Sequence, residues 1–325
     1  MKLPRRRFLH LAGAAAGACV LPRVAHAIDY PTRPVRIIVA VAAGGGADII
    51  ARVIGQWLSE RLGQQFIVEN RPGGGTNIGT EMVARAPADG YTLLLVNLTH
   101  AINATLYEKL NYNFIRDFAP VAGIVGVSNV VEVHPSVPAK TLPEFIAYAK
   151  ANPGKINMGS AGNGSSSHMA GELFKMLAGV NLVHVPYRGQ GPAMTDLLGG
   201  QLQVIFATTP GTTEFVRAGK LNALAVMTAT RADALPDVPP LADFVPGYES
   251  SQWYGLGAPK NTPAEIVDKL NREVNAALVD PKMKARLAEF GGTVMPGPPA
   301  EFGRFIAEET QKWGKVVKFA GIKAD

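Results

Sequence analysis

The sequence predicts an α/β protein of two lobes, each built on a doubly wound sheet with helices on both faces. Three observations support this prediction. The chain has 325 residues, 47% of them hydrophobic, so it is long enough for two domains and too apolar to be largely disordered. Short β-branched runs alternate with segments of helical periodicity. Glycine-rich loops follow several of these runs, at the places where strands of such sheets end.

The first half of the chain repeats a strand–loop–helix unit. Residues 35–41 form a β-branched run that ends at three glycines, as a buried parallel strand would. Behind the glycines, apolar residues recur at helical spacing from Ile50 to Leu62, and Gly63 follows as a stop signal. The remaining expected elements of this half are a strand at 66–69, a loop at 70–75, a helix at 77–86, a strand at 91–96 and a turn at 97–101.

A second α/β region follows a long β-prone run at residues 121–133, which we expect to carry the chain between lobes. Thr141-Leu142-Pro143-Glu144 has the spacing of a capping box, in which a hydroxyl and a carboxylate satisfy free N–H groups of a helix's first turn. The other expected elements are strands at 156–159, 182–185, 203–207 and 223–227, and helices that end at Gly179 and at Gly199-Gly200.

The last part of the chain is expected to return to the first lobe. Residues 229–251 are rich in Pro and Gly and would suit this return. Thr262 is expected to cap a helix, and further helices are expected at 282–290 and 299–318, whose apolar faces need the first sheet to cover them. Two crossings imply a cleft that closes by hinge motion. The expected division is a first lobe of residues 28–128 plus 251–325 and a second lobe of residues 129–250.

Residues 1–27 are predicted to be a cleaved export signal, which places the mature protein in the periplasm. They combine a basic start, a short apolar stretch and the small-residue site Ala25-His26-Ala27. Arg5-Arg6-Arg7-Phe8-Leu9 resembles the core of twin-arginine signals, and an ordinary secretory signal is the alternative. The rest of the chain has 27 basic and 26 acidic residues, so five of the six positive charges in the formal charge of +6 belong to the signal, and the charge indicates no nucleic-acid partner. Cys19 also lies in this segment, so the mature chain has no cysteine nucleophile or thiolate metal site.

Two glycine-rich loops are the strongest candidates for a binding site. Gly44-Gly45-Gly46-Ala47-Asp48 lies between a strand and a helix, where free N–H groups and the helix dipole attract an anion, although such a turn can be only a tight connection. It lacks the spacing of a nucleotide-binding loop. Residues 159–168 occupy the equivalent place in the second half and offer four hydroxyls, the alternative being a serine N-cap on a loop.

Other candidate chemistry is weaker. Tyr187 and Arg188 lie at the mouth of another strand, where Arg188 could pair with a ligand carboxylate or remain solvated. Thr99 is the plausible ligand donor of the 97–101 turn. His168 beside serines suggests a hydrolase, but G-x-S-x-G is absent and the spacing does not suit a nucleophile and its base. The histidines lack metal-ligand spacing, so neither a metal nor a cofactor is expected.

Several segments, in order, resemble the Bug family, the periplasmic solute-binding proteins of tripartite tricarboxylate transport systems. They are IIVAVAAGGGADIIAR at 37–52, ENRPGGGTNIG at 69–79, ADGYTLL at 88–94, residues 158–168, and VPYRGQGPAMTDLLGGQ at 185–201. The resemblance implies a two-lobed type II periplasmic-binding-protein fold, a small organic acid held between the lobes, and membrane permease subunits as partners of a monomeric carrier. A ligand-presenting subunit of a sensor kinase is the alternative, and a periplasmic hydrolase is a third, disfavoured class.

The resemblance also implies which residues hold the ligand. By position, the turn at 43–47 and the loop at 160–166 would grip one carboxylate, with Thr99, Tyr187 and the region after Phe206 lining the rest. Two departures matter: Ala43 replaces a usual proline, and no Asp follows Phe206, which favours a ligand without an amine. The candidate ligand-binding residues are Ala43, Gly44, Gly45, Gly46, Asp48, Thr99, Ser160, Gly162, Gly164, Ser165, Ser166, His168, Tyr187, Arg188 and Thr208.

Overall fold

The computed structural model describes residues 29–320 except 229–230, 233–234 and 249. The predicted export signal therefore lies outside the described residues. Within the described part, no helix is both long and apolar enough to cross a membrane.

The strands form one continuous sheet whose order is β2-β1-β3-β9-β4-β7-β5-β6, with β10 and β8 also paired to β4. The β1–β2, β1–β3, β5–β6 and β5–β7 pairs are parallel, as expected for strand–helix–strand units, whereas β9 and β4 run antiparallel to their neighbours. The strands are β1 (Val35–Val39), β2 (Phe66–Asn70), β3 (Thr92–Asn97), β4 (Phe118–Val133), β5 (Asn157–Ser160), β6 (Val183–Pro186), β7 (Val204–Thr208), β8 (Asn222–Val226), β9 (Ser251–Pro259) and β10 (Gly292–Val294).

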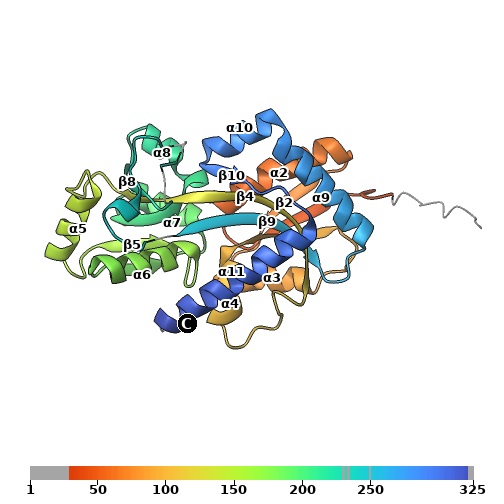
Figure 1. Cartoon of the computed structure of the whole chain (residues 1–325), viewed down its shortest axis with the longest axis horizontal. Coiled ribbons are helices and arrows are strands. Elements are labelled where there is room, and N and C mark those ends of the chain that lie inside the picture. The colour runs from red at the N-terminus through yellow and green to blue at the C-terminus, as the bar shows by residue number, and fades with distance from the viewer. Residues whose placement is uncertain (1–28, 229–230, 233–234, 249, 321–325) are drawn as a thin grey trace, which may run out of the picture.

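Strand β4 runs through both lobes. Its residues up to Ser128 pair with β9, and its residues from Asn129 onward pair with β7 and β8. The long β-prone run is thus one continuous strand, and β9 beside it carries the chain back (Figure 1). These two strands connect the two lobes.

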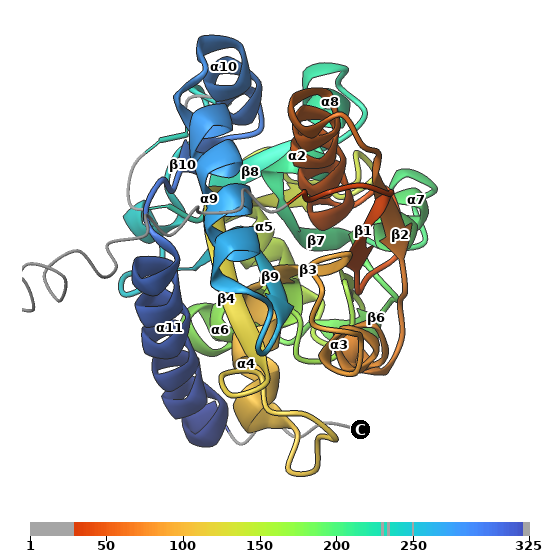
Figure 2. The ribbon, with the colours of Figure 1, turned by 90° about the vertical axis from the view of Figure 1, so that its right-hand side faces the viewer.

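Helices cover both faces of the sheet in each lobe (Figure 2). In the first lobe, Ile50, Leu270 and Leu287 place α2, α9 and α10 on one core, while Val83, Ile102 and Trp313 place α3, α4 and α11 on another. In the second lobe, α5 and α6 share one core and α7 lies on the other. The helices are α2 (Gly46–Leu62), α3 (Asn77–Ala84), α4 (Leu98–Leu106), α5 (Leu142–Ala151), α6 (Ser166–Ala178), α7 (Gln190–Leu198), α8 (Thr213–Arg217), α9 (Ala264–Val279), α10 (Pro281–Glu289) and α11 (Pro299–Ala320), with 3-10 turns η1 (Gly74–Thr76), η2 (Thr209–Gly211) and η3 (Leu241–Asp243).

Local signals are confirmed at some helix ends and wrong at others. Gly63 ends α2 in the left-handed conformation with φ 70°. Thr141 caps α5, accepting from the N–H of Glu144 at 3.4 Å. Thr262 does not cap α9, because its hydroxyl donates to the carbonyl of Pro259 at 2.8 Å and Pro263 stands at the N-cap.

Two connections also differ from expectation. Residues 97–101 are not a turn, since Asn97 caps α4 and the helix begins at Leu98. The return to the first lobe is made by strand β9, whereas Leu241, Val245 and Tyr248 of the Pro- and Gly-rich segment belong to the second-lobe core.

Candidate ligand-binding site

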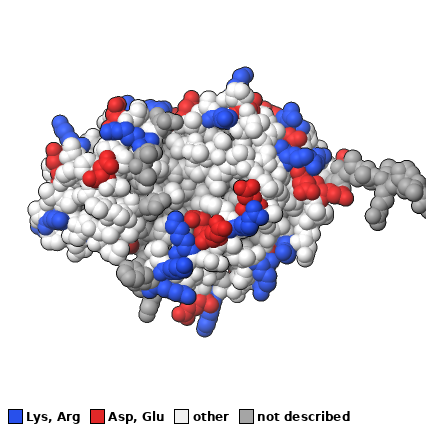
Figure 3. Space-filling model, viewed as in Figure 1, with Lys and Arg blue, Asp and Glu red and all other residues white. Residues whose placement is uncertain are grey.

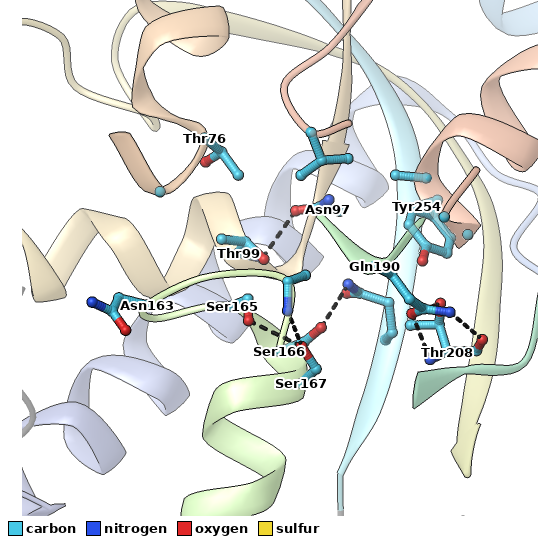
Figure 4. A pocket seen from close by; sticks show the side chains of 17 residues that line it. Thr76, Asn97, Thr99, Asn163, Ser165, Ser166, Ser167, Gln190, Thr208 and Tyr254 are labelled. Carbon is cyan, nitrogen blue, oxygen red and sulfur yellow. Dashed lines mark hydrogen bonds between the residues drawn. The ribbon is translucent and has the colours of Figure 1, made fainter. Parts of the chain in front are cut away.

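An inner pocket lies between the two lobes (Figure 4), and its empty space, together with its opening to solvent, is about 490 Å³. Its walls come from the segments that follow β1, β2, β3, β5 and β6, from the last residue of β7 and from two side chains of β9, so the carboxyl ends of strands from both lobes face it. The lining residues are Val41, Gly45, Gly46, Ala47, Gly75, Thr76, Asn97, Thr99, Ala161, Asn163, Ser165, Ser166, Ser167, Gln190, Thr208, Gln252 and Tyr254. None of these lining side chains is charged.

The pocket wall contains the N-terminal ends of four helices, α2, α4, α6 and α7. The first N–H groups of a helix have no acceptor within the helix, and the helix dipole places partial positive charge at this end. Anions bind at such ends without a cationic side chain. The inner pocket can therefore attract a carboxylate although its lining carries no formal charge.

The first-lobe turn, residues 43–48, is held by a charged side chain outside the pocket. The carboxylate of Asp48 accepts from the N–H of Gly44 at 3.0 Å and pairs with Arg52 at 2.9 Å. Burial alone would raise the pKa of Asp48, but the hydrogen bonds from Arg52 and Gly44 outweigh it and lower the pKa below its ordinary value. Asp48 thus fixes the turn as an anion without lining the pocket.

Gly46 lets two ligand-facing hydroxyls approach the start of α2. A Cβ atom at this position would lie 2.5 Å from Thr208 Oγ1 and 2.7 Å from the Tyr254 hydroxyl. Only glycine leaves room for this arrangement, which brings side chains of β7 and β9 against the first turn of α2.

The second-lobe loop, residues 160–168, is held by neutral hydroxyls. Ser165 caps α6, and its Oγ accepts from the N–H of His168 at 3.2 Å and lies 3.0 Å from Ser167 Oγ. Ser167 Oγ in turn accepts from the N–H of Ala161 at 2.9 Å. The same serines that line the pocket therefore set the shape of the loop.

Two stacked histidines support this loop from behind. The rings of His168 and His184 lie 3.8 Å apart with an angle of 5° between them. His168 Nδ1 accepts from the N–H of Gly164 at 3.1 Å, and His184 Nε2 lies 2.6 Å from Ser160 Oγ. Burial, together with the nearby charge of His168, lowers the pKa of His184 to about 4. Both rings therefore support the backbone and side chains of this loop.

Gln252 of β9 joins the starts of two helices from different lobes. Its Oε1 accepts from the N–H of Leu98 at 3.1 Å, and its Nε2 donates to Ser166 Oγ at 2.9 Å. At α4, Asn97 Oδ1 accepts from the N–H of Thr99 at 3.0 Å. One amide thus sets the relative position of the α4 and α6 N-termini.

Gln190 performs a similar role at the other end of the pocket (Figure 4). Its Nε2 donates to the carbonyl of Thr208 at 3.0 Å, while its Oε1 accepts from the N–H of Thr208 at 2.9 Å and from the Thr208 hydroxyl at 2.7 Å. The start of α7 is therefore fastened to the end of β7 by an uncharged pair.

The structure places the candidate residues in three groups. Those that line the inner pocket are Gly45, Gly46, Thr99, Ser165, Ser166 and Thr208. Those that line an adjoining outer cavity are Gly162, Tyr187 and Arg188. Those that line neither, and lie in the two turns or behind them, are Ala43, Gly44, Asp48, Ser160, Gly164 and His168. Lining residues that sequence reasoning missed include Thr76, Asn97, Gln190, Gln252 and Tyr254.

Among the described residues, no group of three or more His, Cys, Asp or Glu side chains could hold a metal ion.

This fold and this uncharged pocket between lobes define a two-lobed solute-binding protein. The chain belongs to the TctC family, the tripartite tricarboxylate transporter family receptors. The model of this family matches residues 50–322. The expected relationship to the Bug proteins and the two-lobed periplasmic-binding-protein fold are thereby confirmed.

Three solved structures illustrate the similarity. The periplasmic binding protein BugD is 36% identical, with a TM-score of 0.87 over 90% of this chain and 99% of that chain. Rpa4515 of R. palustris, solved with adipate, is 38% identical, with a TM-score of 0.87 over 90% and 99% of the two chains. MatC of Rhodopseudomonas palustris, solved with bound malate, is 33% identical, with a TM-score of 0.83 over 89% and 100%.

Proposed function

We propose that this protein is a periplasmic carrier that captures one small organic acid between its lobes. The observation that carries the proposal is the inner pocket, in which the N-terminal ends of four helices meet uncharged hydroxyl and amide side chains. The ligands in the related structures, adipate and malate, are both carboxylates and support this assignment.

Capture would proceed by closure of the two lobes about β4 and β9. We assign residues 28–128 and 251–325 to the first lobe and residues 129–250 to the second, because the pairing of β4 changes between Ser128 and Asn129. The N–H of Ala42 donates to the carbonyl of Arg188 at 2.9 Å, which joins the lobes beside the pocket. A carboxylate bound to helix starts in both lobes would add to this contact.

The uncharged Gln190–Thr208 pair favours a ligand without an amine. An ammonium group needs a carboxylate partner or several acceptors when it is removed from water. The lining offers no carboxylate, and the Gln190 and Thr208 oxygens are already engaged with each other. Tighter binding of an amino acid than of every simple carboxylate, measured by titration calorimetry, would contradict this assignment.

Delivery to membrane permease subunits is the partner role that we propose, with the carrier acting as an exported monomer cleaved near Ala27. Presentation of the ligand to a sensor kinase is the alternative, and a permease or kinase gene beside this one would distinguish the two.

Acidic and basic side chains are interspersed on the face shown in Figure 3, which suits a carrier better than a nucleic-acid surface.

We propose no catalytic step. Ser160 and His184 are hydrogen-bonded at 2.6 Å, but the Ser160 side chain is fully buried, so a substrate could not reach its hydroxyl. A hydrolase would require turnover of a bound acid by the pure protein.

Thermal-shift screening against organic acids tests the proposal. An acid at 100 times its dissociation constant should stabilise the folded protein by about 2.7 kcal/mol. Ser165→Leu, which fills the pocket at the start of α6, should abolish the shift, whereas Ser136→Leu, at an exposed loop position, should retain it. A panel in which no acid shifts the transition would refute the carrier role; a shift that survives in Ser165→Leu would refute the pocket.

A further inference from the structure

An outer cavity of about 1080 Å³ adjoins the inner pocket. It lies between the loop at 72–76 and Tyr107 of the first lobe and residues 161–163 and 186–188 of the second. The two spaces share five lining residues, namely Val41, Gly75, Thr76, Ala161 and Asn163. A ligand longer than the inner pocket can therefore extend through this shared rim into the outer cavity.

Arg188 is the single charged side chain among the described residues that line these two spaces. Its side chain is exposed, and no ion pair joins it to a described carboxylate. Arg71, close in sequence to the first-lobe loop of the cavity, is instead paired with Glu69. The outer cavity thus has one guanidinium and no lining carboxylate.

The backbone of Arg188 is fixed where the lobes meet. Its carbonyl accepts from the N–H of Ala42 at 2.9 Å, and the preceding N–H, of Tyr187, donates to Ser160 at 3.0 Å. Gly189 follows with φ 149°, and a Cβ there would lie 2.8 Å from the nitrogen of Ala42. The backbone that carries the guanidinium is therefore held at the rim of the cavity by contacts to both lobes.

We propose that Arg188 is a second anion-binding site, which selects elongated acids with an anionic group at each end. This inference rests on the proposed function, because the first carboxylate would occupy the helix N-termini of the inner pocket. The second would extend through the rim and pair with Arg188, whose planar guanidinium can bind a carboxylate through two hydrogen bonds. A monoacid of equal length would leave Arg188 solvated.

Titration calorimetry with matched ligands tests this role. The probes are straight-chain dicarboxylates from malonate to suberate, each compared with the monocarboxylate of the same carbon number. For the longer acids, we expect the dicarboxylate to bind roughly threefold to tenfold more tightly, the range of a partly exposed charged pair. Raising the ionic strength should reduce this preference.

Three variants separate pairing at Arg188 from a general effect of charge. Arg188→Gln should abolish the preference for dicarboxylates, because the dicarboxylate loses its second partner and the monocarboxylate does not, and Arg188→Lys should restore part of this preference. Arg33→Gln removes the same charge at a residue that lines neither cavity and should retain the full preference. An unchanged preference for dicarboxylates in Arg188→Gln would overturn the second anion-binding site but not the carrier function. A lack of binding by every acid would refute the carrier function and, with it, the second site.

Discussion

The first-lobe turn and the second-lobe loop occupy equivalent places but are held by different chemistry. Each follows a parallel strand and begins a helix whose N-terminus faces the inner pocket. In the first, a buried aspartate paired with Arg52 binds the turn's backbone from outside the pocket. In the second, serine hydroxyls and a histidine ring nitrogen form the supporting contacts.

In the first-lobe turn, the side chain that holds the backbone does not line the pocket. In the second-lobe loop, the same serine side chains hold the backbone and line the pocket. Asp48 supports the turn without lining the pocket, so the first-lobe turn itself presents mainly backbone N–H groups to the pocket. Ser165 and Ser167 both shape the second loop and line the pocket. Substitutions in the second lobe should therefore alter stability and affinity together, whereas those in the first should alter them separately.

Gly46→Ala should have the largest effect, and mainly on affinity. The new methyl group would collide with the Thr208 and Tyr254 hydroxyls, and overpacking of this kind costs about 1–3 kcal/mol, or roughly fivefold to 150-fold in affinity. Titration calorimetry should show this loss for every acid that binds. Gly199→Ala, at an exposed position with its nearest neighbour 3.4 Å from the added Cβ, is the control and should bind normally.

Asp48→Asn should reduce stability more than affinity. The variant loses the ion pair to Arg52 but keeps an acceptor for Gly44, and we expect a loss of about 1–2 kcal/mol after allowing for the exposure of Arg52. Because the pKa of Asp48 is lowered by folding, its contribution is present above the unfolded value of 3.8 and disappears as pH falls through the lower folded value. Urea unfolding at pH 7 and at pH 3 should show a smaller difference between wild type and variant at the lower pH.

Ser165→Ala should reduce stability and affinity together. Loss of an N-cap costs about 1 kcal/mol, and the same hydroxyl faces the ligand. Thr141→Ala removes the N-cap of α5, far from the pocket lining, and provides the matched control. Equal losses of stability with a loss of affinity only in Ser165→Ala would support the comparison. Normal affinity in both variants would contradict it.

His184→Asn should have the smallest effect, visible in the pH dependence of stability. Its folded pKa of about 4 lies below the ordinary value of 6.5, so the fold favours the neutral ring. Stability from this group is present above pH 6.5 and is lost as pH falls toward 4. Burial and the charges of His168 and Lys175 lower the pKa, while Glu172 opposes them. Thermal unfolding between pH 7 and pH 4.5 should show a smaller decrease in Tm for the variant than for wild type.

The first-lobe turn and the second-lobe loop could be predicted because the residues that form each of them are adjacent in the sequence. Glycines after a β-branched run, and serines before an amphipathic helix, are local signals of helix N-termini. The same local reasoning found the long strand and the helices that cover the first sheet. The prediction that Thr262 caps α9 was wrong, because the Thr262 hydroxyl donates to the carbonyl of Pro259 and accepts from no N–H group of the helix.

Gln252 and Tyr254 could not be found in this way. They are single polar side chains on a buried strand, and only the register that places Tyr254 opposite Asn97 brings them to the pocket. Gln190 was missed because its role depends on the end of β7, a neighbour only in the folded chain. The available signal was short: Gln252 and Tyr254, two residues apart with Trp253 between them, fall on one face of a strand.

A crystal structure with the acid that gives the largest thermal shift tests the central claim most directly. The account predicts that one carboxylate of that acid lies in the inner pocket, within hydrogen-bond distance of N–H groups in the first turns of both α2 and α6. An acid bound outside this pocket, or bound there through its apolar end with the carboxylate directed away from both helices, would contradict it.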